Sequence, residues 1–401
     1  MTLSPITRRG LGALATAPLF VRPARAQGEK PLRIGVLTDE TGPYADSGGP
    51  GSIVAARMAA ADFGASVLGR KIEIVHADHQ NKPDIAAAIA GRWYDQDGVE
   101  AIIDLPVTAI ALAVQQVAKT RQKTVMITAA ATSDITAKYC NPYSTHWADD
   151  THALTAGTAH AVLAKGGRSW FFITVDHAFG LAMQRDASAV IEAGGGKVLG
   201  AARHPIGATD YAPFLLQAQS SGAQAIGLAS VGGDLINLVK QAAEFGLLAA
   251  NGPIIVGFLT YITDINALGL AITQGLTFSS GFYWDQSDPA RRFAARFFQA
   301  RGAMPTKNQA AIYTATRHYL RACQQAGSSD AMAANRAMRA MPLDFFGHPA
   351  RVRGDGRVLY DLTLYRVKAP DQSHAPWDYY ETLAVIPGDQ AFLPENPACM
   401  P

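Results

Sequence analysis

The chain has 401 residues, of which 48% are hydrophobic and 17% are charged. This length is ample for a buried core and favours two domains. No run approaches the roughly 18 uninterrupted apolar residues of a membrane-spanning helix. No membrane span is therefore predicted after the extreme N-terminus.

The first 26 residues have the pattern of an export signal. Arg8 and Arg9 form a twin-arginine pair, residues 10–21 are weakly apolar, and Ala24-Arg25-Ala26 matches an A-x-A cleavage site. Residues 1–26 are therefore predicted to be a twin-arginine signal peptide; the alternative is a disordered tail that resembles one. Since no cysteine lies in this stretch, we expect a soluble periplasmic protein without a lipid anchor.

The net charge depends on this leader. The whole chain has 35 basic and 33 acidic residues, and the leader contains four arginines and no acid. Its removal leaves 31 basic residues and a net charge of about −2. A slightly acidic mature protein has no electrostatic footprint for nucleic acid, so no nucleic-acid partner is expected.

Predicted strands and helices alternate over most of the chain. In chain order, apolar runs and Ala-rich helical patterns follow one another at 32–38 and 52–66, 71–78 and 84–96, 100–104 and 109–120, 124–128 and 152–165, 169–175 and 180–194, 197–204 and 211–222, 223–230 and 234–246, and last 253–258. Such alternation indicates βαβ units and parallel sheets covered on both faces. The units are too many for one compact sheet. The predicted fold class is therefore α/β, with two doubly wound parallel-sheet lobes.

The pattern then changes. The irregular stretch 139–149 interrupts the alternation and is predicted to be the first crossing between lobes. After residue 285 three consecutive helices are expected, roughly at 288–301, 306–325 and 328–341, and 351–368 is typical of a hairpin. A (β/α)₈ barrel is the competing fold, which the late helices and the hairpin disfavour.

Catalytic and metal motifs are not found. The sequence contains no G-x-S-x-G elbow, no Walker A motif and no G-x-G-x-x-G after the first strand. His76 and His79 flank Asp78, but two histidines on a loop without a further ligand cluster are a weak metal signal. We therefore predict no enzyme activity, no catalytic residues, no metal and no cofactor.

The three cysteines suggest one disulfide in an oxidising compartment. Cys323 lies in a helical run and is predicted to be a buried thiol. Cys140 and Cys399 lie in Pro-containing irregular stretches, and we favour them as a bridge that holds the C-terminal tail.

Several segments together suggest a family. They are "IGVLTDETGPYADSGGPGSIVAARMAAADF", "ITAAATSDIT", "VDHAFGLAMQRD", "GLASVGGDLINLVKQAAEFG", "FLTYITDINALG" and "PWDYYETLAVIPGDQAF". In this order and spacing, the chain resembles the type I periplasmic solute-binding proteins of ABC transporters, the group that contains the branched-chain amino acid receptors. Within that family it looks most like the branch associated with aromatic acids.

The resemblance implies two lobes joined by three crossover segments. Lobe 1 would contain residues 31–147 and 278–342, and lobe 2 would contain residues 148–277 and 343–401. It also implies a monomer that closes both lobes around a ligand by a hinge movement and presents it to a membrane permease.

The stretch "MITAAATSD", residues 126–134, ends a predicted strand at the edge where open α/β sheets bind ligands. Small side chains there would let an anion reach main-chain N–H groups, so Ala130, Ala131 and Thr132 are predicted to bind ligand. The alternative is that the alanines only permit close packing and that Ser133 or Asp134 caps a helix.

Other strand ends point to the same cleft. Pro106 and Thr108 follow the third strand, and Tyr44 follows the first. All three are predicted to line the cleft. Thr108 is equally plausible as a helix cap, and Tyr44 as an exposed loop aromatic.

The second lobe is expected to contribute Asp176, Phe179 and Phe258, with Tyr283 from the next loop. Phe179 would pack on an apolar ligand body, while Asp176 would contact ligand or hold its own loop. At least two aromatics of the segments 258–264 and 281–285 are expected to be core or hinge residues.

One departure from the family pattern bears on the ligand. Amino-acid receptors of this family need an acid to pair with the ligand ammonium, since a buried unpaired cation is costly. Their acid follows the strand where this chain has "FLTY". We therefore predict an aromatic or other apolar carboxylate ligand; Asp176 or Asp234 could still serve an amino acid. The alternatives are a branched-chain amino acid or amide receptor and a ligand-sensing module for signalling.

Overall fold

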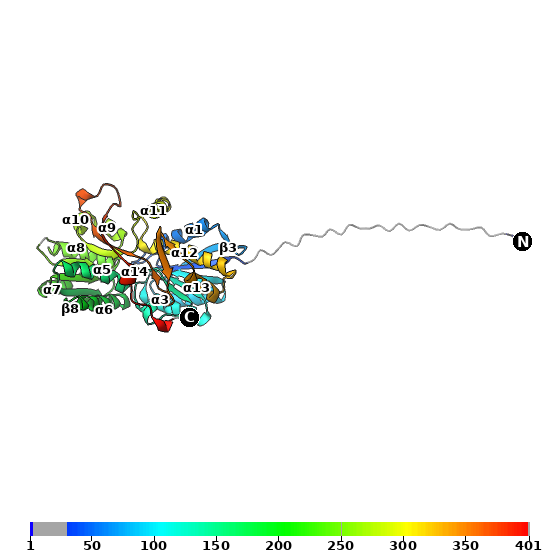
Figure 1. The fold of residues 1–401 in the computed structure, drawn as a ribbon, viewed down its shortest axis with the longest axis horizontal. Helices are drawn as coiled ribbons and strands as arrows, with labels where there is room; N and C mark the ends of the chain where they lie inside the picture. The colour runs from blue at the N-terminus through cyan, green and yellow to red at the C-terminus, as the bar shows by residue number, and fades with distance from the viewer. Residues whose placement is uncertain (3–29, 250, 400–401) are drawn as a thin grey trace.

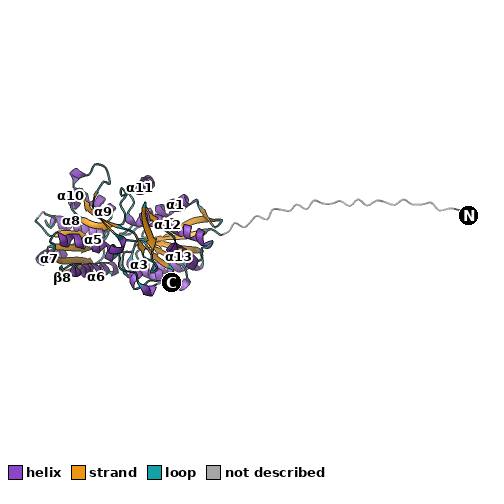
Figure 2. Cartoon of the chain, in the orientation of Figure 1, coloured by secondary structure: helices purple, strands orange, loops and turns teal. Residues whose placement is uncertain are grey.

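The computed structural model describes residues 1–2, 30–249 and 251–399. The predicted leader, apart from its first two residues, lies outside this part of the chain. Two bodies lie side by side, with the N-terminal strands and helices in one and the middle of the chain in the other (Figure 1). Both combine sheets with covering helices (Figure 2). This arrangement confirms the predicted α/β class with parallel sheets.

The sheet of the first lobe is parallel except at one edge, where β2 pairs with β3 antiparallel. In the described residues its strand order is β2 (Ser66–Val67), β3 (Arg70–Asp78), β1 (Leu32–Thr38), β4 (Val99–Asp104), β5 (Thr124–Ile127) and β6 (Ser144–His146). Ile34 and Val36 pack on one face of the sheet, and Leu37 packs on the other. This alternation is the period of two expected of a strand buried on both faces.

Helices cover both faces of this sheet. One face is packed by α1 (Gly49–Phe63), α11 (Asp288–Arg301), α12 (Lys307–Ala326) and α13 (Ala331–Ala340), and the other by α2 (Pro83–Asp95) and α3 (Thr108–Arg121), while α4 (Asp134–Ala137) follows β5. The long helix α12 begins at a capping box, in which the Thr306 hydroxyl accepts from the Gln309 N–H and the Gln309 side chain accepts from the Thr306 N–H. The helix therefore starts at a defined point beside the cleft.

The second lobe repeats the design. Its parallel sheet has the order β10 (Ile254–Gly257), β9 (Ala225–Ala229), β7 (Ser169–Val175) and β8 (Lys197–His204) in the described residues, with α5 (Thr151–Ala164), α6 (Ala178–Ala193), α7 (Ala212–Ser220), α8 (Gly233–Glu244), α9 (Ile262–Leu268) and α10 (Leu270–Thr273) around it. Trp170, Phe172 and Phe258 stack in its core with ring centroids 6.2–6.4 Å apart. The three rings belong to the same apolar cluster as Tyr44 and Ala131 of the first lobe, so this core continues to the boundary between the lobes.

Two small antiparallel sheets close the chain. One contains β11 (Thr277–Ser280), β15 (Leu362–Val367) and β16 (Tyr380–Ile386), and the other contains β12 (Leu343–Phe345), β13 (His348–Val352) and β14 (Val358–Leu359); η1 (Pro370–Gln372), α14 (Gly388–Ala391) and η2 (Pro397–Cys399) complete the elements. The expected hairpin over 351–368 forms only between β13 and β14. Its second half, β15, leaves to pair with β11 and β16 instead.

The boundaries proposed for the lobes stay predictions, but side-chain packing bears on one of them. Phe345, Val358 and Tyr360 belong to the core cluster that contains α11 and α12 of the first lobe. Tyr365 and Tyr380 belong to a cluster with the second sheet. After the predicted boundary at 342/343, the chain therefore packs on the first lobe up to Leu362, on the second sheet from Tyr365 to Tyr380, and on the first lobe again at Ala391 and Phe392.

The crossing segments meet at buried charges. Asp149, in the first crossing, accepts hydrogen bonds from the Gly281 N–H (3.1 Å) and the Tyr360 hydroxyl (2.9 Å), which lie in the two other crossings. Its Oδ2 also lies 3.2 Å from Nζ of Lys307, the first residue of α12. Nearby, the buried Arg357 donates to the carbonyl of Ala148 over 2.7 Å. These contacts join the segments that pass between the lobes.

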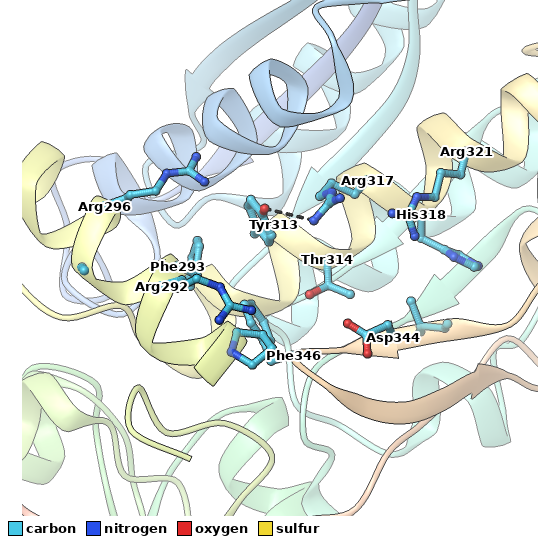
Figure 3. A pocket seen from close by; sticks show the side chains of 13 residues that line it. Arg292, Phe293, Arg296, Tyr313, Thr314, Arg317, His318, Arg321, Asp344 and Phe346 are labelled. Carbon is cyan, nitrogen blue, oxygen red and sulfur yellow. Dashed lines mark hydrogen bonds between the residues drawn. The ribbon is translucent and has the colours of Figure 1, made fainter. Parts of the chain in front are cut away.

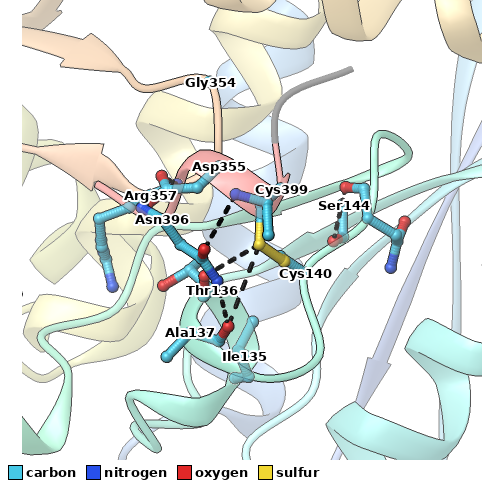
Figure 4. The surroundings of a disulfide bond; sticks show 12 residues. Ile135, Thr136, Ala137, Cys140, Ser144, Gly354, Asp355, Arg357, Asn396 and Cys399 are labelled. Atoms are coloured by element: carbon cyan, nitrogen blue, oxygen red, sulfur yellow. Dashed lines mark hydrogen bonds between the residues drawn. A yellow bond between two sulfur atoms is a disulfide. The ribbon is translucent and has the colours of Figure 1, made fainter. Parts of the chain in front are cut away.

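Cys140 and Cys399 form a disulfide, with Cα atoms 5.7 Å apart and a sequence separation of 259. The bond joins the C-terminal tail to the segment after α4, where the Asn396 side chain also donates to the Ala137 carbonyl (Figure 4). Cys323 is a free buried thiol.

Reduction of the disulfide is expected to lower the free energy of unfolding by about 2–4 kcal/mol, since a long loop is no longer closed in the unfolded chain. Thermal unfolding with and without a thiol reductant measures this. A Cys399→Ser variant should be insensitive to the reductant, and Cys323→Ala should keep the full response. A reductant effect of equal size in Cys399→Ser would contradict the assignment.

Among the residues that the structure describes, no helix has both the length and the apolar character needed to cross a bilayer.

Candidate ligand-binding cleft

A cavity lies between the lobes at the carboxyl ends of the parallel strands. In the first lobe it is lined by residues that follow β1, β4 and β5, and in the second by residues that follow β7, β9 and β10: Tyr44, Ser47, Pro106, Val107, Thr108, Ala129, Ala131, His177, Phe179, Val231, Leu259 and Tyr261. This edge is where open α/β sheets bind ligands. The cavity is therefore the candidate site.

The lobes are closed over this cavity, which encloses about 20 Å³. That is room for about one water molecule. Tyr44 and Ala131 of the first lobe pack in one apolar cluster with Phe179 and Leu259 of the second. A ligand larger than water therefore needs these side chains, or the lobes, to move apart.

Tyr44 is held in place by Asp39. The buried Asp39 carboxylate accepts hydrogen bonds from the N–H groups of Gly42 (2.8 Å) and Tyr44 (2.9 Å), and from the Asn81 side chain (2.9 Å). Such a carboxylate-bonded turn fixes the loop. Burial raises the pKa of the Tyr44 hydroxyl. It therefore reaches the cavity as a neutral group that donates and accepts hydrogen bonds.

The first turn of α3 supplies anion-binding chemistry. Its N-cap, Val107, has no side-chain capping bond. The next residue, Thr108, lines the cavity, and its buried hydroxyl has no hydrogen-bond partner among the described residues. Because free N–H groups and the helix dipole favour negative charge, this end of the cavity suits an anion.

His177 adds a donor from the second lobe. Its Nδ1 accepts from the Phe179 N–H over 3.2 Å, so Nε2 carries the proton of the neutral ring. That Nε2 is buried and has no partner within the described part of the chain. Burial lowers the pKa of His177. The cavity therefore presents a neutral N–H here.

The structure brings half of the ten predicted ligand residues to the cavity, namely Tyr44, Pro106, Thr108, Ala131 and Phe179. Two others lie directly behind its wall. The Ala130 carbonyl accepts from Nε2 of His146 over 2.7 Å, and the Thr132 hydroxyl accepts from the Asp134 N–H over 3.3 Å. They support the wall and do not line it.

Three predicted residues lie elsewhere. Phe258 is fully buried in the aromatic stack of the second lobe. The Tyr283 hydroxyl donates a hydrogen bond to the Trp377 carbonyl over 3.0 Å, beside the sheet of β11, β15 and β16. The Asp176 side chain is 57% exposed and lies 4.0 Å from Arg203. A strand-end position alone does not show which way a side chain turns.

The polar end of "MITAAATSD" connects the lobes. The Ser133 hydroxyl donates to Asp186 of α6 over 2.7 Å, and Arg185 donates to Asp134 over 3.1 Å. Neither Ser133 nor Asp134 lines the cavity. Although Ser133 precedes α4, its side chain makes no capping bond. These side chains therefore hold the second lobe against the first.

The cavity also includes residues outside the predicted set: Ser47, Val107, Ala129, His177, Val231, Leu259 and Tyr261. His177 and Tyr261 lie in loops that the sequence marked as cleft loops. Val231 and Leu259 come two residues after β9 and β10, so counting from strand ends would have found them. Their apolar side chains have no functional group that would mark them as ligand-binding residues in the sequence.

Within the described residues, no group of three or more His, Cys, Asp or Glu side chains is arranged to hold a metal ion.

A family model described as "Periplasmic binding protein" matches residues 31–373. The chain belongs to this family. This periplasmic binding protein is similar to the crystal structure of a periplasmic binding protein from Burkholderia mallei, at 44% identity and a TM-score of 0.88, over 90% of this chain and 96% of that chain. It is also similar to a branched chain amino acid ABC transporter periplasmic ligand-binding protein from Burkholderia xenovorans LB400, at 38% identity and a TM-score of 0.81, over 90% and 97% of the chains.

More distant relatives also match this binding protein. A Leu/Ile/Val-binding protein homolog from Brucella melitensis is 26% identical over 64% of this chain and 66% of its own length, just under two thirds. A solute binding protein from Rhodopseudomonas palustris HaA2, in complex with p-hydroxybenzoic acid, is 22% identical with a TM-score of 0.81, over 90% and 98% of the chains. At that identity the likeness shows the fold alone.

Proposed function

We propose that this protein is exported to the periplasm, binds a small carboxylate with an aromatic or other apolar body in the cleft, and delivers it to an ABC import permease. One observation carries the ligand class. The cavity is lined by neutral donors beside the first turn of α3, while no Asp or Glu of the described residues lines it. Such a lining favours an anion over a cation.

The two acids that could serve an amino acid do not line the cavity. One oxygen of Asp234, Oδ1, accepts hydrogen bonds from the Gly207 N–H and the Tyr211 hydroxyl, each over 2.9 Å. Asp176 is exposed. A ligand ammonium closed into this cavity would therefore lack a carboxylate partner, and a buried unpaired charge costs several kcal/mol.

The apolar wall supports a ligand body without polar groups. Phe179, Val231 and Leu259 from the second lobe face Pro106 and Val107 from the first. An aromatic ring between these walls would bury apolar surface on both sides. The carboxylate would then lie at the α3 end, beside Thr108.

A branched-chain amino acid is the second candidate. It is favoured by the similarity, at 38% identity, to the branched chain amino acid ABC transporter periplasmic ligand-binding protein from Burkholderia xenovorans LB400.

Thermal unfolding of residues 27–401 against a compound panel tests the proposal. The panel holds benzoates, hydroxycinnamates and phenylacetates beside leucine, valine and amides. A ligand at 100 times its dissociation constant adds about 2.7 kcal/mol to the free energy of unfolding. Stabilisation by aromatic acids alone supports the proposal. Stabilisation by leucine or valine alone contradicts it.

Thr108→Val is expected to lower the affinity for the carboxylate ligand found in the thermal test by roughly tenfold, because a hydrogen bond to a charged group contributes about 1.5–3 kcal/mol. The fold should be unaffected, since the Thr108 hydroxyl has no partner among the described residues. Thr120→Val on the exposed end of the same helix is the matched control, and calorimetric titration measures both. Equal affinities for the two variants would remove Thr108 from the site.

A further inference from the structure

A second, larger cavity lies on the first lobe, apart from the cleft. It is a groove of about 590 Å³ between α11, α12 and the β12 turn, and it shares no lining residue with the cleft cavity. Figure 3 shows its side chains: Pro289, Arg292, Phe293, Ala295, Arg296, Tyr313, Thr314, Arg317, His318, Arg321, Leu343, Asp344 and Phe346. The volume is within the roughly 300–1,000 Å³ of small-molecule sites.

The rim of this groove is rich in arginine. Arg292 and Arg296 lie one turn apart on α11, and Arg317 and Arg321 lie one turn apart on α12. Arg296 is paired with Asp62 at 2.7 Å. Arg317 donates to the Tyr313 hydroxyl over 3.1 Å, and that hydroxyl donates to Asp62 over 2.6 Å, so Asp62 is shared between two arginines, and Arg317 has no direct ion pair among the described residues. The groove therefore holds more positive charge than its neighbours neutralise.

Two of these arginines make no polar contact within the described residues. Arg292 and Arg321 are exposed, and within the described residues they have neither a hydrogen bond nor an ion pair. One acid, Asp344, belongs to the lining, and both of its oxygens accept from the Gly347 N–H. In a mature chain of net charge about −2, this is a local positive field that attracts anions.

The histidine of the lining, His318, is neutral. Its Nε2 lies 2.9 Å from the Met338 carbonyl, and burial lowers its pKa. It is therefore part of the wall and adds no charge.

The floor of the groove is aromatic and buried. The rings of Phe293 and Tyr313 have centroids 4.6 Å apart, and those of Phe293 and Phe346 have centroids 5.1 Å apart. A planar apolar ligand body could lie on this floor. The guanidinium groups above it suit carboxylate or phosphate oxygens, which arginine binds in a bidentate manner.

We propose that this groove is a second ligand site, which binds a small organic polyanion with a planar apolar body and two or more carboxylate or phosphate groups. The anionic groups lie at Arg292, Arg317 and Arg321, and the body lies over Phe293 and Phe346. All lining residues come from elements of the first lobe, so binding does not require the cleft to close.

Calorimetric titration of residues 27–401 with trimesate, a benzene ring with three carboxylates, tests the site at low salt. The double variant Arg292→Ala/Arg321→Ala is expected to lose roughly tenfold or more in affinity, because hydrogen bonds to charged groups contribute about 1.5–3 kcal/mol. Its matched control is Arg301→Ala/Arg336→Ala, which removes two exposed helix arginines outside the groove. The control should retain the wild-type affinity, and Asp344→Asn should increase it.

Each contrary outcome overturns the proposal. These are no trimesate binding by the wild-type protein, an equal loss in the control double variant, and tighter binding of an acidic peptide than of trimesate at the same arginines. Trimesate binding should also survive Gly232→Ala, which obstructs cleft closure because a Cβ at Gly232 of the second lobe would lie 2.9 Å from the Pro43 carbonyl oxygen of the first. If Gly232→Ala abolishes trimesate binding, trimesate binds in the cleft, and the proposal of a second site is wrong.

Discussion

Gly232→Ala is expected to weaken ligand binding in the cleft by roughly tenfold or more, because a clash on closure costs at least the 1.4 kcal/mol of a tenfold change. Gly232 follows β9 with φ of 62°, and a Cβ there would lie 2.9 Å from the Pro43 carbonyl oxygen and 3.4 Å from the Tyr44 ring. Pro43 and Tyr44 belong to the opposite lobe. The added methyl group therefore meets backbone on closure, and calorimetric titration with the stabilising compound measures the loss.

Gly269→Ala is the matched control. Gly232 has φ of 62° and ψ of −137°, and Gly269 has φ of 79° and ψ of 155°, so both residues adopt backbone conformations that are essentially restricted to glycine. A Cβ at Gly269 would meet nothing within 4 Å. Only Gly232→Ala opposes closure. If the two variants bind ligand equally well, closure does not bring Gly232 against Tyr44 in solution.

Asp149→Ala is expected to lower the free energy of unfolding by about 3–5 kcal/mol, because it leaves a buried cation without its partner. The Lys307 side chain is 6% exposed, and its Nζ lies 3.2 Å from Asp149, close enough for an ion pair but without the alignment of a hydrogen bond. The same substitution removes the acceptor for Gly281 and Tyr360, which join the other crossings. Chemical unfolding measures the loss.

The double variant Asp149→Ala/Lys307→Met separates the two causes. Removing the lysine charge as well should restore a large part of the lost stability, since no unpaired ion is left. The part not restored measures the hydrogen bonds between the crossings. A double variant as unstable as Asp149→Ala alone would show that the ion pair contributes little.

The α/β architecture was predictable because its signal is local. Leu32–Thr38 and Ser169–Val175 are short apolar runs, and both form strands buried on both faces. The three late helices begin and end close to their predicted limits, helped by caps such as Thr306 and Gly327. The hydrophobic periodicity and the capping residues that predict these elements lie within each segment itself.

The third crossing was less predictable. The alternating run around the turn at Gly356 indicates a hairpin, and β13 and β14 do form a short one. Residues 362–367 instead pair with β11, which is more than 80 positions earlier in the sequence. Local pattern shows that a strand forms, but its partner depends on packing between distant segments.

The candidate site, like the fold, was in part predictable from the sequence and in part not. The sequence by itself determined which strand ends meet at the cleft, because the carboxyl ends of parallel strands lie along one edge. Only the tertiary structure decided that Ala131 lines the cavity while Ala130 lies behind it, that Leu259 and not Phe258 lines the cavity, and that arginines of α11 and α12 share a groove. These outcomes depend on contacts between segments far apart in the chain, and no residue's immediate neighbours in the sequence encode them.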